Sequence, residues 1–208
     1  MNRGLWAVFA AMGALWSLGA AATERGDWLV RVGAHYVDPK SDNNEVVSVE
    51  SATSLTFDVT YMLDPHWGVE LLGAYPFEHD INLNGGGSPK IGDTKQLPPT
   101  LSVIYNFLPQ SRWRPYAGIG VNWTIFFDEN LSGPLAGADL SLEQSVGVAY
   151  VVGLDVDLND KWFCNVDVRY INIDTDATVH PADNSPNINV GSVQIDPWAF
   201  GANIGYRF

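Results

Sequence analysis

The sequence predicts an all-β fold, an eight-stranded antiparallel transmembrane β-barrel with short periplasmic turns and long extracellular loops. Three observations support this prediction. Eight segments alternate apolar side chains with small or polar ones, aromatic residues gather at the ends of these segments, and the connections are alternately short and long. Together these features are typical of a small barrel of the bacterial outer membrane.

The last segment shows the alternation most clearly. From Trp198 to Phe208, even-numbered positions are apolar and odd-numbered positions are small or polar. A strand of about ten such residues matches the thickness of the hydrocarbon layer. A terminal aromatic residue also resembles the signal that bacterial barrel-assembly machinery reads. We therefore expect Tyr206 and Phe208 to form an assembly signal.

Seven earlier segments repeat the pattern, and their connections orient the barrel. The alternating segments are residues 28–36, 55–63, 67–77, 97–107, 116–125, 146–156 and 162–170. Three connections are short and turn-rich, namely 64–66, 108–112 and 158–161. Four are long, namely 37–50, 79–94, 128–143 and 174–192. Short turns belong on the periplasmic side of such barrels and long loops outside.

This orientation places the aromatic residues in two belts. The inner belt holds Trp28, Tyr61, Trp67, Tyr105, Phe107, Trp162 and Phe208, and the outer belt holds Tyr36, Tyr75, Phe77, Trp123, Phe127, Tyr170 and Trp198. A soluble β-sandwich is the alternative. It gives no reason for aromatic residues at both strand ends.

The N-terminus predicts export. Arg3 precedes an apolar run from Leu5 to Leu18, and small residues follow up to Ala22. This order is typical of a signal peptide, so we expect residues 1–22 to be cleaved and residues 23–208 to form the barrel. A membrane anchor is the alternative, but the apolar run is short for a spanning helix.

Composition disfavours several classes of function. The net charge of −13 and the lack of a basic run disfavour nucleic acid as a partner. The single cysteine, Cys164, shares a face with apolar neighbours and is interpreted as a filler. The four histidines have no companion motif, so neither catalysis nor a cofactor is expected. Asp155–Asp160 starts like a calcium loop but lacks the required Gly and Glu, and no metal site is predicted.

Alternation also predicts what the barrel encloses. The inward charges are expected to pair and close the lumen, although a very narrow water-filled pore is the alternative. They are Arg31, Asp58, Glu70, Lys95, Asp155, Asp167, Arg169 and Arg207. Apolar inward residues are expected to line a hydrophobic channel. In its upper part they are Leu72, Phe126, Ile171 and Ile173, and lower down they are Leu29 and Met62.

Several stretches resemble the OmpW family of small outer-membrane barrels. They occur in family order and include Trp67-Gly-Val-Glu-Leu-Leu72, Lys95-Gln-Leu-Pro-Pro-Thr-Leu101, Ile195-Asp-Pro-Trp198 and the terminal Gly205-Tyr-Arg-Phe208. The resemblance implies a narrow hydrophobic channel in the extracellular half, blocked toward the periplasm. It also implies passive uptake of small hydrophobic molecules, which leave sideways through the barrel wall into the membrane.

Three prolines fit such a lateral exit. Pro98 and Pro99 interrupt one strand, and Pro76 lies near the outer end of its neighbour. Proline cannot donate a ladder hydrogen bond, so these residues predict a local gap, unless they only shape strand ends. A structural or surface-binding barrel without transport is the alternative function. The expected partners are outer-membrane lipid, lipopolysaccharide, hydrophobic solutes and the assembly machinery, with the barrel acting as a monomer.

Overall fold

The computed structural model describes residues 22–40, 47–83, 90–183 and 185–208. The predicted signal peptide lies outside these ranges except for Ala22. Within them the strands are β1 (Trp28–Asp38), β2 (Val47–Val49), β3 (Ala52–Met62), β4 (Trp67–Ala74), β5 (Phe77–Leu83), β6 (Lys90–Leu97), β7 (Thr100–Asn106), β8 (Trp113–Leu131), β9 (Asp139–Leu142), β10 (Ser145–Asp157), β11 (Trp162–Ile171), β12 (Asp174–His180), β13 (Ile188–Gln194) and β14 (Trp198–Arg207). No helix in the described ranges is long and apolar enough to cross a membrane.

Eight of these strands close into an antiparallel barrel. The order is β10-β11-β14-β1-β3-β4-β7-β8, and β8 pairs with β10 to complete the ring. The first and last strands meet from Leu29↔Arg207 to Asp38↔Trp198. Closure leaves no open strand edge, which a barrel needs within a lipid bilayer. The predicted fold is therefore confirmed.

The outer face of the barrel is apolar. Leu55 on β3 is 67% exposed, whereas its neighbour Thr56 is 3% exposed. The same contrast separates Val146 from Ser145 on β10. Side chains alternate between the two faces of a strand, so each barrel strand presents apolar groups outward and polar groups inward. This arrangement suits lipid outside and a polar interior.

Side chains of the short turns bind the turn backbone. Between β3 and β4, Asp64 Oδ1 accepts hydrogen bonds from the backbone N–H groups of His66 and Trp67, at 2.7 and 3.0 Å. Between β10 and β11, Asn159 Oδ1 accepts the N–H groups of Lys161 and Trp162 in the same way. Asp and Asn are favoured in turns for this reason.

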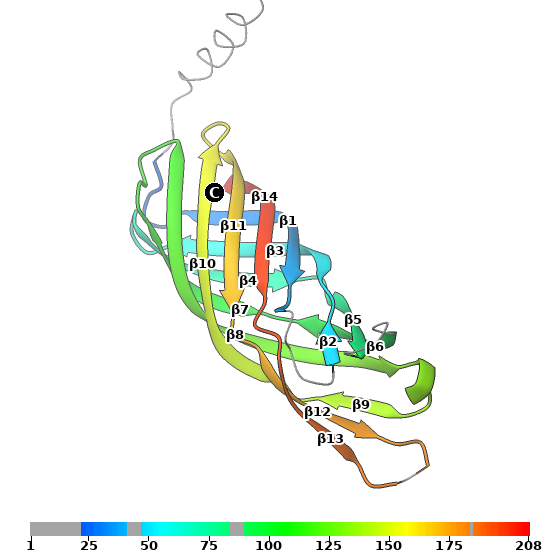
Figure 1. Cartoon of the computed structure of the whole chain (residues 1–208). Coiled ribbons are helices and arrows are strands. Elements are labelled where there is room, and N and C mark those ends of the chain that lie inside the picture. Colours follow the sequence, from blue (N-terminus) through cyan, green and yellow to red (C-terminus); the bar gives the residue numbers. More distant parts are fainter. Residues whose placement is uncertain (1–21, 41–46, 84–89, 184) are drawn as a thin grey trace, which may run out of the picture.

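The long connections are not irregular loops. They contain β2, β5 and β6 on one side and β9, β12 and β13 on the other, which extend the barrel wall at the end opposite the short turns (Figure 1). The upper half of β8 continues into this extension and pairs with β6 up to Gly92↔Leu131. The sequence missed these strands because turn-forming residues obscure their alternation.

The alternation changes phase at Pro76. Tyr75 is 73% exposed, as the outer belt predicts, but Phe77 is 2% exposed and packs against Val37, Ala52 and Ala199. The assignment of Phe77 to the outer belt was therefore wrong. The phase changes because the strand is interrupted between β4 and β5, and β5 starts with the opposite face inward.

Candidate functional site: an apolar cavity above a charged interior

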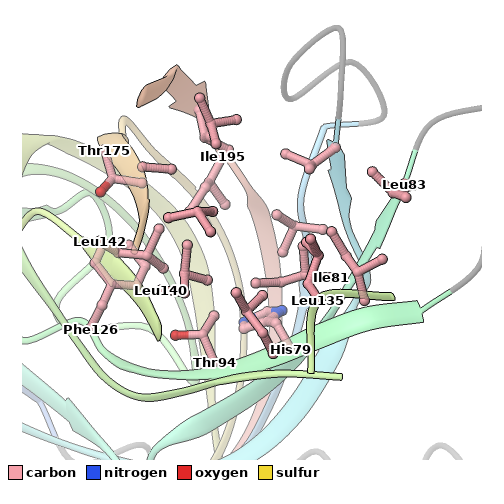
Figure 2. A pocket seen from close by; sticks show the side chains of 18 of the residues that line it. His79, Ile81, Leu83, Thr94, Phe126, Leu135, Leu140, Leu142, Thr175 and Ile195 are labelled. Atoms are coloured by element: carbon pink, nitrogen blue, oxygen red, sulfur yellow. The ribbon is translucent and has the colours of Figure 1, made fainter. Parts of the chain in front are cut away.

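The extracellular extension encloses an apolar cavity of about 210 Å³. Its walls come from β2, β5, β6, β8, β9, β12 and β13, and Figure 2 shows side chains from these strands pointing toward one another across it. Most of the lining is aliphatic or aromatic and includes Ile81, Ile91, Phe126, Leu140, Ala177 and Val193. Such a concave, apolar lining suits a small hydrophobic ligand.

Four polar side chains interrupt this lining: His79, Thr94, Gln96 and Thr175. The Thr175 hydroxyl donates to the carbonyl oxygen of Glu143 at 2.6 Å, and the Thr94 hydroxyl reaches the carbonyl oxygen of Lys95 at 3.5 Å. The Gln96 side-chain nitrogen lies 2.8 Å from His79 Nε2. The polar groups therefore bond mainly to the protein and leave the space itself apolar.

Below the cavity, the barrel interior is filled by paired charges. Arg31 from β1 is at its centre and is 1% exposed. Its guanidinium donates to both carboxylate oxygens of Asp155, at 2.8 and 3.1 Å. It also donates to Asp58 at 2.6 Å and to the Thr60 hydroxyl at 3.0 Å. One cation thus ties β1, β3 and β10 together across the lumen.

A second cluster surrounds Arg169 of β11. Its guanidinium donates to Glu70 and to Asp167, each at 2.8 Å. Asp167 also lies 3.0 Å from Nε2 of His35, whose Nδ1 is 2.6 Å from the Thr56 hydroxyl. Glu70 lies 3.7 Å from Arg31, which connects the two clusters.

A third cluster lies nearer the periplasmic end. Asp157 of β10 pairs with Arg114 and, at 3.3 Å, with Arg207. Arg114 is 0% exposed and also approaches Asp155 at 3.7 Å. Its guanidinium and that of Arg31 both lie 5.4 Å from the centre of the Phe163 ring. These contacts occupy the lower lumen.

The sequence therefore predicted most members of this network but not all. Arg31, Asp58, Glu70, Asp155, Asp167, Arg169 and Arg207 are buried within it. Lys95 has to be removed from the set, because its side chain is 38% exposed and pairs with the exposed carboxylate of Asp128. Lys95 shares the parity of Leu97, and a residue two positions along a strand lies on the same face.

The network also contains residues that the sequence reasoning missed, chiefly His35, Arg114, Asp157, Asn165 and Asn203. Asn165 donates to Asp155 at 2.8 Å, and Asn203 donates to Asn165 at 2.8 Å. A signal was available for Arg114, which has the same parity as the inward-facing Tyr116. Which charges bond to one another depends on pairing across the barrel, and alternation along one strand does not reveal it.

The predicted channel residues lie at three levels. Phe126 lines the cavity, and Ile171 and Ile173 belong to the buried apolar cluster that surrounds it. Leu72 is buried beside the end of the β4–β7 ladder, where it pairs with Thr100. Two remaining residues, Leu29 and Met62, pack with Phe163 in a separate cluster. A lining role for all six stays a prediction.

The predicted proline gap coincides with a break in pairing. The ladder between β4 and β7 ends at Leu72↔Thr100, and the ladder between β5 and β6 resumes at Phe77↔Gln96. Residues 73–76 and 97–99 face each other between these two ladders and include Pro76, Pro98 and Pro99. Neither ladder includes a pair between these two stretches. An opening in the wall at this point stays a prediction.

On the other side of the prolines, the wall is held by Asn122 of β8. Its side-chain nitrogen donates to the carbonyl oxygens of Pro98 and Pro99, at 3.1 and 3.3 Å. The backbone N–H of Trp123 also donates to Pro99 at 2.9 Å. The interruption is therefore one-sided: Pro98 and Pro99 are bonded to β8, and neither the β4–β7 nor the β5–β6 ladder includes them.

The end of the chain has the features of the predicted assembly signal. Phe208 is 71% exposed at the end of β14, and its ring meets that of Tyr206 at 4.6 Å between centroids. Its backbone N–H donates to the carbonyl oxygen of Trp28. Recognition by assembly machinery stays a prediction. Within the described part of the chain, no three His, Cys, Asp or Glu side chains are grouped so as to hold a metal ion.

The fold and the site define an outer-membrane β-barrel with paired charges in its interior and an apolar extracellular cavity. The sequence model of the OmpW family matches residues 24–208. The chain is 39% identical over 212 residues to outer membrane protein W of Vibrio cholerae, and the match covers 96% of each protein. The chain therefore belongs to the OmpW family and resides in the bacterial outer membrane.

Solved structures agree with this assignment. The crystal structure of the outer membrane protein OprG from Pseudomonas aeruginosa matches with a TM-score of 0.82 at 35% identity, covering 91% of this chain and 99% of that one. The solid-state NMR structure of the outer membrane protein AlkL in lipid bilayers matches with a TM-score of 0.66 at 26% identity, covering 93% and 95% of the two chains.

Proposed function

We propose that this barrel is a passive channel through which small hydrophobic molecules cross the lipopolysaccharide layer. The observation that supports it most directly is the apolar cavity in the extracellular extension. A polar lipopolysaccharide surface opposes the entry of apolar solutes, and a cavity of this kind offers them a favourable environment. The charge network beneath disfavours passage of such solutes straight down the lumen.

The same proposal includes a sideways exit into the membrane. Gln96 supports this step because it lines the cavity and also forms the first pair above the proline gap. A solute leaving the lower end of the cavity would therefore meet the stretch where the wall lacks a ladder. Leu72, at the lower border of this stretch, supplies an apolar surface.

Uptake by whole cells tests the proposal. Cells lacking the protein, with and without its restoration, are given labelled alkanes, aromatic hydrocarbons, fatty acids and a small polar solute. We expect faster uptake of the apolar solutes only. Ala177→Trp, which fills the cavity from β12, should reduce the gain, whereas Ala202→Trp on the outer face of β14 should not. Equal uptake with and without folded protein would contradict the channel.

One observation favours a second candidate, a structural or surface-binding barrel without transport. The lumen is occupied by paired charges contributed by seven barrel strands, as a barrel built for rigidity requires. This candidate predicts that Ala177→Trp leaves every uptake rate unchanged. In either case, the expected surroundings are outer-membrane lipid and lipopolysaccharide, with the barrel-assembly machinery engaged during biogenesis.

A further inference from the structure

The apolar cavity contains a polar atom without a partner. Gln96 is 1% exposed and lines the cavity, and its side-chain oxygen Oε1 has no hydrogen-bond partner among the described residues. Buried polar atoms in folded proteins nearly always have a partner, so such an atom needs an explanation. In a ligand cavity, the natural explanation is a partner that arrives with the ligand.

The hydrogen bonds around Gln96 decide which of its two amide groups is unpaired. His79 Nδ1 lies 2.7 Å from the backbone carbonyl oxygen of Glu50. A carbonyl oxygen can only accept, so Nδ1 carries the hydrogen. In a neutral imidazole, Nε2 is then an acceptor, and the Gln96 side-chain nitrogen 2.8 Å away donates to it.

Burial keeps this imidazole neutral. The pKa of His79 is held below its usual value, chiefly because burial disfavours the charged form. With the amide nitrogen of Gln96 directed at His79, the amide oxygen is turned away from it. The unpaired group in the cavity is therefore a hydrogen-bond acceptor.

The two threonine hydroxyls of the lining do not donate a hydrogen bond to Gln96 Oε1. The hydroxyl hydrogens of Thr175 and Thr94 are directed at the backbone carbonyl oxygens of Glu143 and Lys95. The cavity thus offers a ligand an apolar surface and one strongly placed acceptor that nothing in the described chain satisfies.

We infer that the cavity selects small apolar molecules that carry one hydrogen-bond donor, such as aliphatic alcohols, phenols or indoles, and holds the donor at Gln96 Oε1. This inference rests on the proposed function and narrows its substrate class. A pure hydrocarbon leaves the acceptor unpaired in a dry site, and a site built to bond a donor discriminates against the analogue that lacks it.

Two isomers test the selection directly. 1-Octanol and heptyl methyl ether have the same atoms and similar size, but only the alcohol has an O–H group. Binding of labelled 1-octanol to the protein in lipid nanodiscs is measured with each isomer as competitor, after correction for partition into protein-free nanodiscs. One hydrogen bond corresponds to a preference for the alcohol of about five- to tenfold.

Variants locate the acceptor. Gln96→Leu alone would leave His79 Nε2 as a new acceptor, so the decisive variant is His79→Leu with Gln96→Leu. It should bind both isomers equally. Thr175→Val removes a hydroxyl from the same cavity and should keep the preference of the wild type. Heat-modified migration of the folded barrel in gels confirms that each variant has assembled.

The outcomes separate this inference from the uptake proposal. Equal binding of the two isomers by the wild type, with binding lost in Ala177→Trp, would overturn the selection and leave the channel standing. A preference that persists in the double variant would overturn the role of Gln96. If neither isomer binds above the lipid background, the cavity is not a binding site, and both proposals are contradicted.

Discussion

At the scale of single residues, the barrel interior depends on how each buried charge is paired. Arg31 has three carboxylates within 4 Å, those of Asp58, Glu70 and Asp155. A buried charge that loses its partner cannot be solvated by water, so the cost of removal exceeds the net value of the pair. An exposed pair such as Lys95–Asp128 keeps its water and contributes little.

This difference predicts the stability of two matched variants. Arg31→Met should lower the free energy of unfolding by about 3–5 kcal/mol, because it removes the cation that bonds directly to the buried carboxylates of Asp58 and Asp155. Lys95→Met, the same chemical change at an exposed pair, should cost about 0–1 kcal/mol. Urea unfolding in lipid vesicles measures both. A similar cost for the two variants would refute a structural role of the network.

A second residue-scale prediction concerns pH. His79 has a lower pKa in the folded protein than its ordinary value of 6.5, so the unfolded chain binds more protons just below that value. Its contribution to stability is complete above pH 6.5 and is lost as the pH falls toward the folded pKa. The hydrogen bond to the backbone carbonyl of Glu50 and, to a smaller extent, the carboxylate of Asp80 oppose this lowering of the pKa but do not cancel it.

The measurement is the unfolding free energy of the wild type relative to His79→Leu, followed from about pH 8 to about pH 5. The wild type should lose stability relative to the variant below pH 6.5. Because the titration of other groups is common to both proteins, the difference isolates His79. A constant difference across this range would show that His79 does not titrate as inferred.

At the scale of elements, the ladders of the wall are interrupted where residues 73–76, between β4 and β5, face residues 97–99, between β6 and β7. Pro98 and Pro99 lack the N–H groups that a ladder to β4 and β5 requires, and Asn122 fixes their carbonyl oxygens to β8. The change of phase at Pro76 falls in the same stretch of the wall. The interruption thus separates the membrane barrel from the extracellular extension at one place in the wall.

Restoring the missing donors should close this gap. In Pro98→Val with Pro99→Thr, we expect uptake of hydrophobic solutes to fall toward the level of cells without the protein, while the barrel stays folded. Pro65→Ala, in the short turn between β3 and β4, is the control for loss of proline elsewhere and should leave uptake unchanged. Normal uptake by the double variant would remove the lateral exit.

At the scale of the whole molecule, three zones follow one another along the barrel axis. Short turns form the periplasmic end, an apolar band with exposed rings at its borders faces the lipid and surrounds the paired charges of the interior, and the paired strands beyond it enclose the cavity. Figure 1 shows this extension continuing the wall away from the end where the C-terminus lies. Each zone has the polarity of its surroundings.

Cys164 reports on this placement. It is exposed on the outer face of β11, paired with Val156 and Ile204, so lipid should cover it. A charged, membrane-impermeant maleimide should label it far more slowly in bilayers than after unfolding. Gln110→Cys in a Cys164→Ser background, placed in an exposed short turn, should react rapidly in both states. Fast labelling of Cys164 in intact bilayers would contradict the assigned lipid face.

The sequence alone predicted the barrel, its orientation and most of its inward charges, because side-chain alternation is a local property with a period of two residues. Arg31 and Asp167 were assigned to the interior in this way, and Lys95, although its parity matched that of the outward Leu97, was wrongly included. The same reasoning failed at Phe77, where an interruption at Pro76 reverses the faces.

Only the tertiary structure decided which groups meet. The contact between Gln96 and His79 joins the paired strands β5 and β6. The cavity that these two residues line is completed by residues far away in the sequence, such as Val47 and Ile195. Such contacts depend on strand register and on the closure of the barrel, which no local pattern encodes. The sequence therefore determined which kind of protein this is, and the assembled walls determined where a solute can bind.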